Sequence, residues 1–205
     1  MRGHFPQWLS TTLKTIGGVA VIAGCVAGSV LTGGALSVVL AGAAIGAMAG
    51  GVGAGVSTVV SGGDVHDFAN AFLMSTITGA ASGAVATTKL GVVAQIGINS
   101  ALNIGNYVGT QMLSGNKITL GGVVANGTIG AVCGWIGQSG WMQGQKTSAF
   151  VAFAGKNALK HVFGMVGTET LLRMTLPAFA IGGFGGGIYS GISSHFNKNG
   201  NFVGI

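Results

Sequence analysis

The sequence predicts an all-α protein built from glycine-rich, apolar helical hairpins that insert into a membrane. Three observations carry this prediction: very few charges, long uncharged blocks, and small residues that recur at every fourth position. Of 205 residues, nine are lysine or arginine, three are acidic, and 41 are glycine. An ordinary soluble domain is roughly 25% charged, and its charged side chains cover its surface. This chain is 49% hydrophobic, which also separates it from polar disordered chains.

The net charge of +6 indicates an anionic partner. Nucleic-acid binding needs clustered cations with interleaved aromatic residues, and the lysines and arginines here are dispersed. Scattered cations suit lipid headgroups, so we expect a lipid bilayer as the partner and no nucleic acid. Two cysteines, Cys25 and Cys133, are too few for a disulfide scaffold and are expected as small buried thiols.

The charges divide the chain into uncharged blocks, and a helix needs about 20 residues to cross a bilayer. The first block is more than twice that length and is expected to form a hairpin that turns near Thr32-Gly33-Gly34. Each later block matches one span. The blocks are residues 15–63, 68–88, 90–116, 118–145 and 174–197.

Short breaks separate these blocks, as expected for antiparallel hairpins. They fall at Gly62-Gly63-Asp64, at Lys89, at Gly115-Asn116-Lys117 and at Gln145-Lys146. Before the first block, Pro6 and Trp8 favour an amphipathic lead-in over a cleaved signal peptide.

Helix is preferred to strand because period-two alternation is absent and small residues recur four apart, on one helix face. Such rows let two backbones approach closely, as in membrane helices. The glycines predicted to pack helices together are Gly42, Gly46, Gly50, Gly79, Gly83, Gly97, Gly105, Gly109, Gly130, Gly134, Gly183 and Gly187.

Every predicted span is only weakly apolar, which suits a protein that enters lipid after delivery. A polar stripe also runs along residues 90–116, at Asn99, Asn103, Asn106 and Thr110. Two interpretations of this stripe remain open. It lines a pore, or it forms hydrogen bonds between helices.

The chain is expected to have three regions: hairpins over 1–145, a cationic amphipathic segment over 146–173, and an apolar hairpin or helix with a polar tail over 174–205. The middle segment either lies at a membrane interface or caps the bundle as a surface helix. The lysines expected at membrane interfaces are Lys89, Lys117, Lys146, Lys156 and Lys160.

The one compact cluster of titratable groups is Asp64, His66 and Asp67. We expect Asp64 to cap a helix that begins near residue 65. Two alternatives remain: a pH-sensitive insertion hinge, because protonation of both aspartates removes the only negative charges before residue 169, or a metal site. No phosphate-binding, nucleophile-elbow or metal-ligand motif occurs, so no catalytic residue, metal or cofactor is predicted.

Residues 62–88, GGDVHDFANAFLMSTITGAASGAVATT, place an acidic, aromatic turn before Gly/Ala/Ser repeats. This sequence pattern resembles the glycine-zipper-rich C-terminal toxin regions of bacterial polymorphic toxins. These include Rhs-type effectors of type VI secretion and related contact-dependent and LXG toxins. The resemblance implies a secreted effector that acts at the target bacterium's inner membrane. There it forms a small oligomeric ion-conducting pore that depolarises the cell. It also implies a cognate immunity protein and a secretion carrier or chaperone.

Two other functions compete with a pore. The chain is a non-catalytic helical segment that packs or translocates a larger toxin, or, as a weaker alternative, a hydrolase toxin. A packing segment expressed alone leaves bacteria unharmed. A hydrolase causes lysis or loss of DNA instead of depolarisation.

Overall fold

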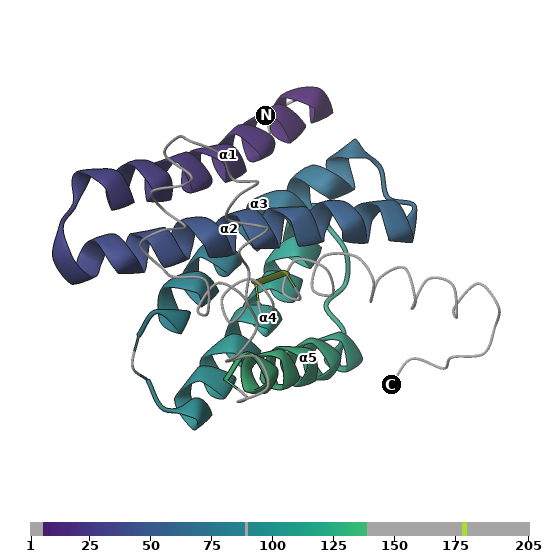
Figure 1. Ribbon diagram of the computed structural model, residues 1–205. Helices are drawn as coiled ribbons and strands as arrows, with labels where there is room; N and C mark the ends of the chain where they lie inside the picture. Colours follow the sequence, from purple (N-terminus) through teal and green to yellow (C-terminus); the bar gives the residue numbers. More distant parts are fainter. Residues whose placement is uncertain (1–5, 89, 139–177, 180–205) are drawn as a thin grey trace, which may run out of the picture.

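The computed structural model describes residues 6–88, 90–138 and 178–179 (Figure 1). These residues are overwhelmingly helical and contain no strand, which confirms the predicted all-α class. Five helices follow one another: α1 (Gln7–Leu31), α2 (Gly34–Ser61), α3 (Val65–Ala86), α4 (Val92–Ser114) and α5 (Leu120–Gln138).

The turns between the described helices fall at the predicted breaks, and a glycine with positive φ lies at three of them, the first being Gly34 with φ of 64°. Gly62 and Gly115 adopt the left-handed conformation, with φ of 68° and 69°, immediately after α2 and α4. After α2, the N–H of Gly63 donates to the carbonyl of Thr58, which satisfies a carbonyl at the helix end. Such tight turns send each helix back along the one before it, so the chain runs up and down.

Helix α3 lies at the centre of the arrangement and packs against α1, α2 and α4, while α5 packs against α4. Figure 1 shows α1 and α2 side by side at the top of the view, with α4 and α5 below them. Because two turns separate them, α1 and α3 run in the same direction, and Thr11 lies beside His66.

Helix α1 begins at Gln7, so the expected lead-in continues without a break into the first apolar helix. Lys14 therefore lies two turns inside α1 and does not mark its beginning. The helix tolerates this charge because the ammonium group has a partner, Asn70 on α3. Cys25 and Cys133 are free thiols and are partly buried.

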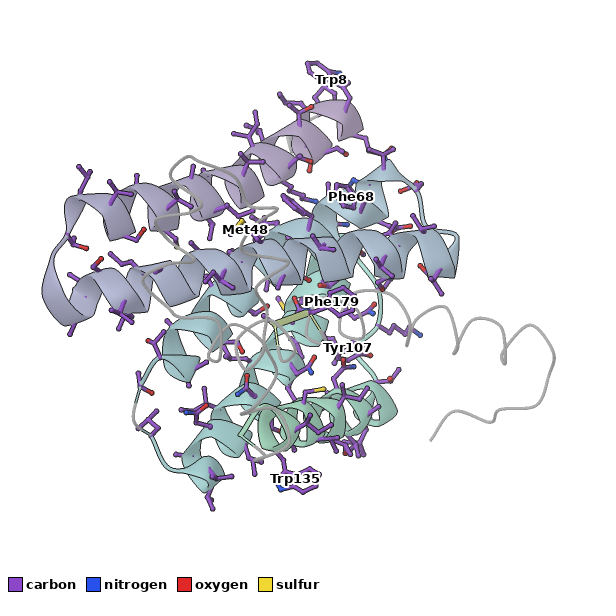
Figure 2. All side chains as sticks on the ribbon, in the orientation of Figure 1. Trp8, Met48, Phe68, Tyr107, Trp135 and Phe179 are labelled. Atoms are coloured by element: carbon purple, nitrogen blue, oxygen red, sulfur yellow. The ribbon has the colours of Figure 1, made fainter. Side chains whose placement is uncertain are left out.

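The burial pattern is the reverse of that in a water-soluble bundle. Among the described residues, the buried apolar side chains are nearly all alanines, and Ile45 is the one large aliphatic residue with almost no exposure. Serine, threonine, asparagine and glutamine fill the rest of the interior. Large apolar side chains lie outside instead: Leu31, Val59 and Val93 are each more than 80% exposed. Figure 2 shows Trp8 and Trp135 projecting outward, while Tyr107 lies among the helices.

Among the described helices, α1, α2 and α3 are long and apolar enough to cross a membrane. Helix α5 is apolar but shorter over Leu120–Ile136. Helix α4 carries the polar stripe on its inner face. Small and polar residues inside with large apolar residues outside is the arrangement that membrane helices adopt.

Candidate functional site

The closest helix contact joins α2 to α3 through glycine. Gly42, Gly46 and Gly50 on α2 lie against Gly83, Gly79 and Ser75 on α3, in antiparallel order. A Cβ atom added to any of the three α2 glycines would come within 3.0 Å of a backbone oxygen on α3. The two backbones therefore touch directly at five of the glycines that the sequence singles out, Gly42, Gly46, Gly50, Gly79 and Gly83.

Helices α4 and α5 form a second close contact. A Cβ atom on Gly130 would lie 2.8 Å from the Cβ atom of Asn103, and one on Gly134 would lie 3.2 Å from the Cβ atom of Asn99. Both glycines thus lie against α4. Gly122 was not predicted from the sequence, yet it makes room for the ring of Tyr107, which is 2% exposed.

The predicted packing role of Gly97 and Gly105 is not what the described helices show. Both glycines are exposed, and a Cβ atom on either would meet nothing within 4 Å. Asparagines occupy the face of α4 that turns inward, and the glycine row lies on another face of the same helix. Gly109 differs, since it contacts the side chain of Met74 on α3. Gly183 and Gly187 lie outside the described residues.

The buried polar side chains form a continuous feature that we name the polar seam. It follows the contacts of α4 with α3 and α5, and it contains Ser75, Thr78 and Ser82 on α3, Asn99, Asn103, Asn106 and Thr110 on α4, and Asn126 on α5. All eight side chains are buried.

Two hydrogen bonds cross the polar seam between α3 and α4. Ser82 Oγ donates to Asn99 Oδ1 at 2.6 Å, and Ser75 Oγ donates to Asn106 Oδ1 at 3.5 Å. The predicted stripe thus lies between helices of one chain. Asn99 and Asn106 thus form interhelical hydrogen bonds. The stripe does not face an open lumen in the described part of the chain.

Several atoms of the polar seam are buried without a hydrogen-bond partner among the described residues. They are both amide atoms of Asn103, Oγ1 of Thr110 and Oδ1 of Asn126. An unpaired polar group in an apolar environment costs several kcal/mol, on the order of 2–7 for an amide or hydroxyl. Such groups in native proteins call for an explanation, such as bound water or an ion.

Asn126 shows how the orientation of these amides is fixed. Its Nδ2 donates to the carbonyl of Gly122, one turn earlier, at 2.8 Å. Asn99 does the same with the carbonyl of Gln95, at 2.9 Å. Since a backbone carbonyl can only accept, the amide turns its Nδ2 group toward that carbonyl. The side-chain oxygen of each asparagine therefore points away from the helix backbone. Sequence reasoning did not select Asn126; the signal that marks it is a single amide side chain within the apolar run Leu120–Ile136.

One end of the polar seam continues into a network that joins three helices. Lys14 Nζ on α1 donates to Asn70 Oδ1 on α3 at 2.5 Å, and Asn70 Nδ2 donates to Ser114 Oγ on α4 at 2.9 Å. Asn70 is fully buried. A single neutral amide thus links a cationic side chain to the end of α4, and sequence reasoning did not find this link.

The predicted helix cap is confirmed at Asp64. Its Oδ1 accepts from the backbone N–H groups of His66 and Asp67, at 2.8 and 2.9 Å, and α3 begins at Val65. Asp67 completes a capping box with the backbone N–H of Asp64. His66 Nδ1 lies 3.1 Å from Thr11 Oγ1. The pH-sensitive hinge stays a prediction, and the described residues contain no group of three or more histidine, cysteine, aspartate or glutamate side chains that could hold a metal ion.

Lys117 is exposed in the turn between α4 and α5, beyond the end of α4. It lies at the same end of the bundle as Lys14 and Asp64, because α1 and α3 begin where α4 ends. The placements predicted for Lys89, Lys146, Lys156 and Lys160 fall outside the described residues, as does the segment 146–173.

Comparison with protein-family models, with curated proteins and with solved structures finds no match. The class of protein is therefore defined by the fold alone: an all-α bundle with three helices suited to crossing a membrane. The resemblance to polymorphic toxins remains an expectation from the sequence.

Proposed function

We propose that this chain is a membrane-active bacterial toxin that inserts into the inner membrane of a target cell and dissipates its membrane potential by conducting ions. The reversed burial pattern carries the proposal. Water favours bundles with large apolar residues inside, whereas lipid tails solvate such residues on the outside. Leu31, Val59 and Val93 on three different helices fit the second environment.

Helix α4 is too polar to enter lipid alone, but its neighbouring helices shield its polar side chains from the lipid. Its asparagines are covered by α3 on one side and by α5 on the other. Side chains such as Val93, which is 84% exposed, remain on its outer face. Assembly of the bundle therefore removes the main cost of placing α4 in a bilayer.

The polar seam is the proposed ion path. Together with the network that reaches Ser114, it follows 15 residues of α4 from Asn99, a rise of about 22 Å, against about 30 Å for the hydrocarbon layer. The α2–α3 contact joins two backbones directly, whereas the α3–α4 contact runs through polar side chains. Water enters the α3–α4 contact more readily, so conduction begins with hydration of this contact.

The proposal includes the partners that the resemblance implies: a secretion carrier or chaperone, and an immunity protein in the producing cell. It involves no catalytic step, cofactor or nucleic acid. The proposal also includes association of several copies in the membrane. The exposed Gly97 and Gly105 offer a face on which the backbones of two copies can approach.

Expression of the full chain in bacteria loaded with a voltage-sensitive dye tests the proposal. We expect loss of membrane potential within minutes of induction, before any DNA-binding dye enters. Cells that grow normally and stay polarised would contradict it and support a non-catalytic packing or translocation segment. Lysis or DNA loss ahead of depolarisation would indicate a hydrolase.

A further inference from the structure

We propose that Asn103 and Asn126 form a binding site for a monovalent metal cation inside the bundle. The site deepens the proposed function, on which its role in conduction rests, because it names the ion class that the polar seam accepts. Its existence is tested below without any measurement of conduction.

The contacts of α5 place the two asparagines at the same depth. Gly130 lies against Asn103, and Gly122, eight residues earlier, lies against Tyr107. Asn126 is midway between these glycines, so it faces the turn of α4 that runs from Asn103 to Tyr107. The offset along the axis between the two asparagines is about 3 Å at 1.5 Å per residue. Both side chains are fully buried.

The unpaired atoms at this depth favour a cation. The Nδ2 group of Asn126 is held by the carbonyl of Gly122, which leaves Oδ1 as an acceptor without a partner. The amide of Asn103 has neither atom paired, so it can also present its oxygen. Amide oxygens replace hydration water around monovalent cations in channel filters.

The described residues of the polar seam include no carboxylate, which favours a singly charged ion over a doubly charged one. Calcium sites are built largely from carboxylates, and magnesium gives up its water reluctantly. The described residues of the polar seam carry no formal charge, only amides and hydroxyls. Neutral oxygens compensate for the free-energy cost of dehydrating a singly charged ion far more readily than for that of a doubly charged one.

A positively charged side chain of the protein is bound in the same manner, by the oxygen of a neutral amide. The ammonium group of Lys14 is bound by Asn70 Oδ1, the oxygen of a neutral amide, at the end of the polar seam. Thr110 Oγ1 is a further unpaired oxygen, two turns along α4 from Asn103 and about 10 Å away. It is too distant to share the same ion and provides a second position along the path.

Thermal unfolding of the full chain in neutral detergent, in potassium chloride or in N-methyl-D-glucamine chloride, tests the site. A ligand that binds only the folded state raises its stability. We expect the Tm to be roughly 5 °C higher at saturating potassium than in the large organic cation. An equal Tm in the two salts would overturn the proposal, whatever any variant does.

Variants then assign the effect to the two asparagines. Asn126→Leu and Asn103→Leu are each expected to abolish the difference in Tm between the salts. Thr128→Val is the matched control, since it removes an exposed hydroxyl from the outer face of α5 and should keep the difference. A difference that persists in both leucine variants would overturn the assignment. If one variant fails to fold, the other decides.

The test of the cation site and the test of the proposed function can fail independently of each other. Potassium-dependent stabilisation in a chain that leaves bacteria polarised would preserve the site and remove the toxin function. Depolarisation without potassium-dependent stabilisation would preserve the function and remove the site.

Discussion

The backbones of Gly46 and Gly79 lie in direct contact. A Cβ atom on either residue would come within 3.0 Å of the carbonyl oxygen of the other. The relation is reciprocal, and it repeats one turn away between Gly42 and Gly83. At Gly46 and Gly79 no side chain separates the two backbones, so the contact there comes from close packing of backbone atoms.

The first prediction concerns this contact. Gly46→Leu combined with Gly50→Leu should separate α2 from α3, because the new side chains meet backbone atoms that cannot move aside. Overpacking costs about 1–3 kcal/mol per site and often more when backbone is displaced. Thermal unfolding in detergent should show a large loss of stability, and depolarisation of expressing cells should be lost with it.

The matched control is Gly97→Leu combined with Gly105→Leu. These glycines belong to the row Gly97-Ala101-Gly105, which has the same four-residue spacing, but the space around them is open. We expect stability of the single chain close to that of the wild type. A loss as large as that of the α2 variant would mean that the described contacts do not determine which glycines pack.

The contrast between the two glycine rows shows what sequence reasoning could and could not determine. Spacing alone predicted helices, turns and the candidate rows, because periodicity and glycine conformations are local properties. It could not choose between two faces of α4, since Gly97-Ala101-Gly105 and Asn99-Asn103-Asn106 both recur at helical spacing. The choice depends on which neighbours cover the helix. For the same reason, the pairings of Lys14 with Asn70 and of Gly122 with Tyr107 were not predicted.

The second prediction concerns the helix cap. Asp64→Ala should destabilise the chain by about 1 kcal/mol, because two backbone N–H groups at the start of α3 lose their acceptor. Asp64→Asn keeps a capping oxygen and should lose much less. Thermal unfolding in detergent at pH 7 compares them. Equal losses in the two variants would show that the charge, rather than the cap, is the stabilising feature.

The third prediction concerns the hinge hypothesis. Asp64→Asn combined with Asp67→Asn mimics protonation of both carboxylates. If charge at this turn opposes insertion, the variant should release dye from liposomes at pH 7 as fast as the wild type does in acid strong enough to protonate both carboxylates. Among the described residues, the other titratable or charged groups at this end are His66, Lys14 and Lys117, so the variant His66→Gln serves as the control for histidine protonation. Wild-type release that is independent of pH would contradict the hinge.

The fourth prediction concerns the end of the polar seam. Lys14→Met removes a fixed positive charge beside the proposed ion path while keeping an apolar stem of similar length. A unit charge at 4 Å contributes about 1 kcal/mol in water, equivalent to about a fivefold change in rate. We expect potassium efflux from liposomes to rise by about that factor. Lys117→Met, which removes a charge from the exposed turn at the same end, should change efflux much less.

The fifth prediction tests whether the outer surface faces lipid. Val52 is 60% exposed on α2, away from both ends of the helix, and Val60 is 68% exposed one residue before its end. In a bilayer, Val52→Arg should hinder insertion by about 2.5–3.5 kcal/mol, whereas Val60→Arg can extend its charge to the interface. Alkaline extraction of membranes from expressing cells measures the inserted fraction. In a bundle that works in water, both substitutions would be equally harmless, because an exposed arginine on either site is simply solvated. Equal retention of the two variants would therefore place the surface of α2 in water, and a selective loss of Val52→Arg would place it in lipid.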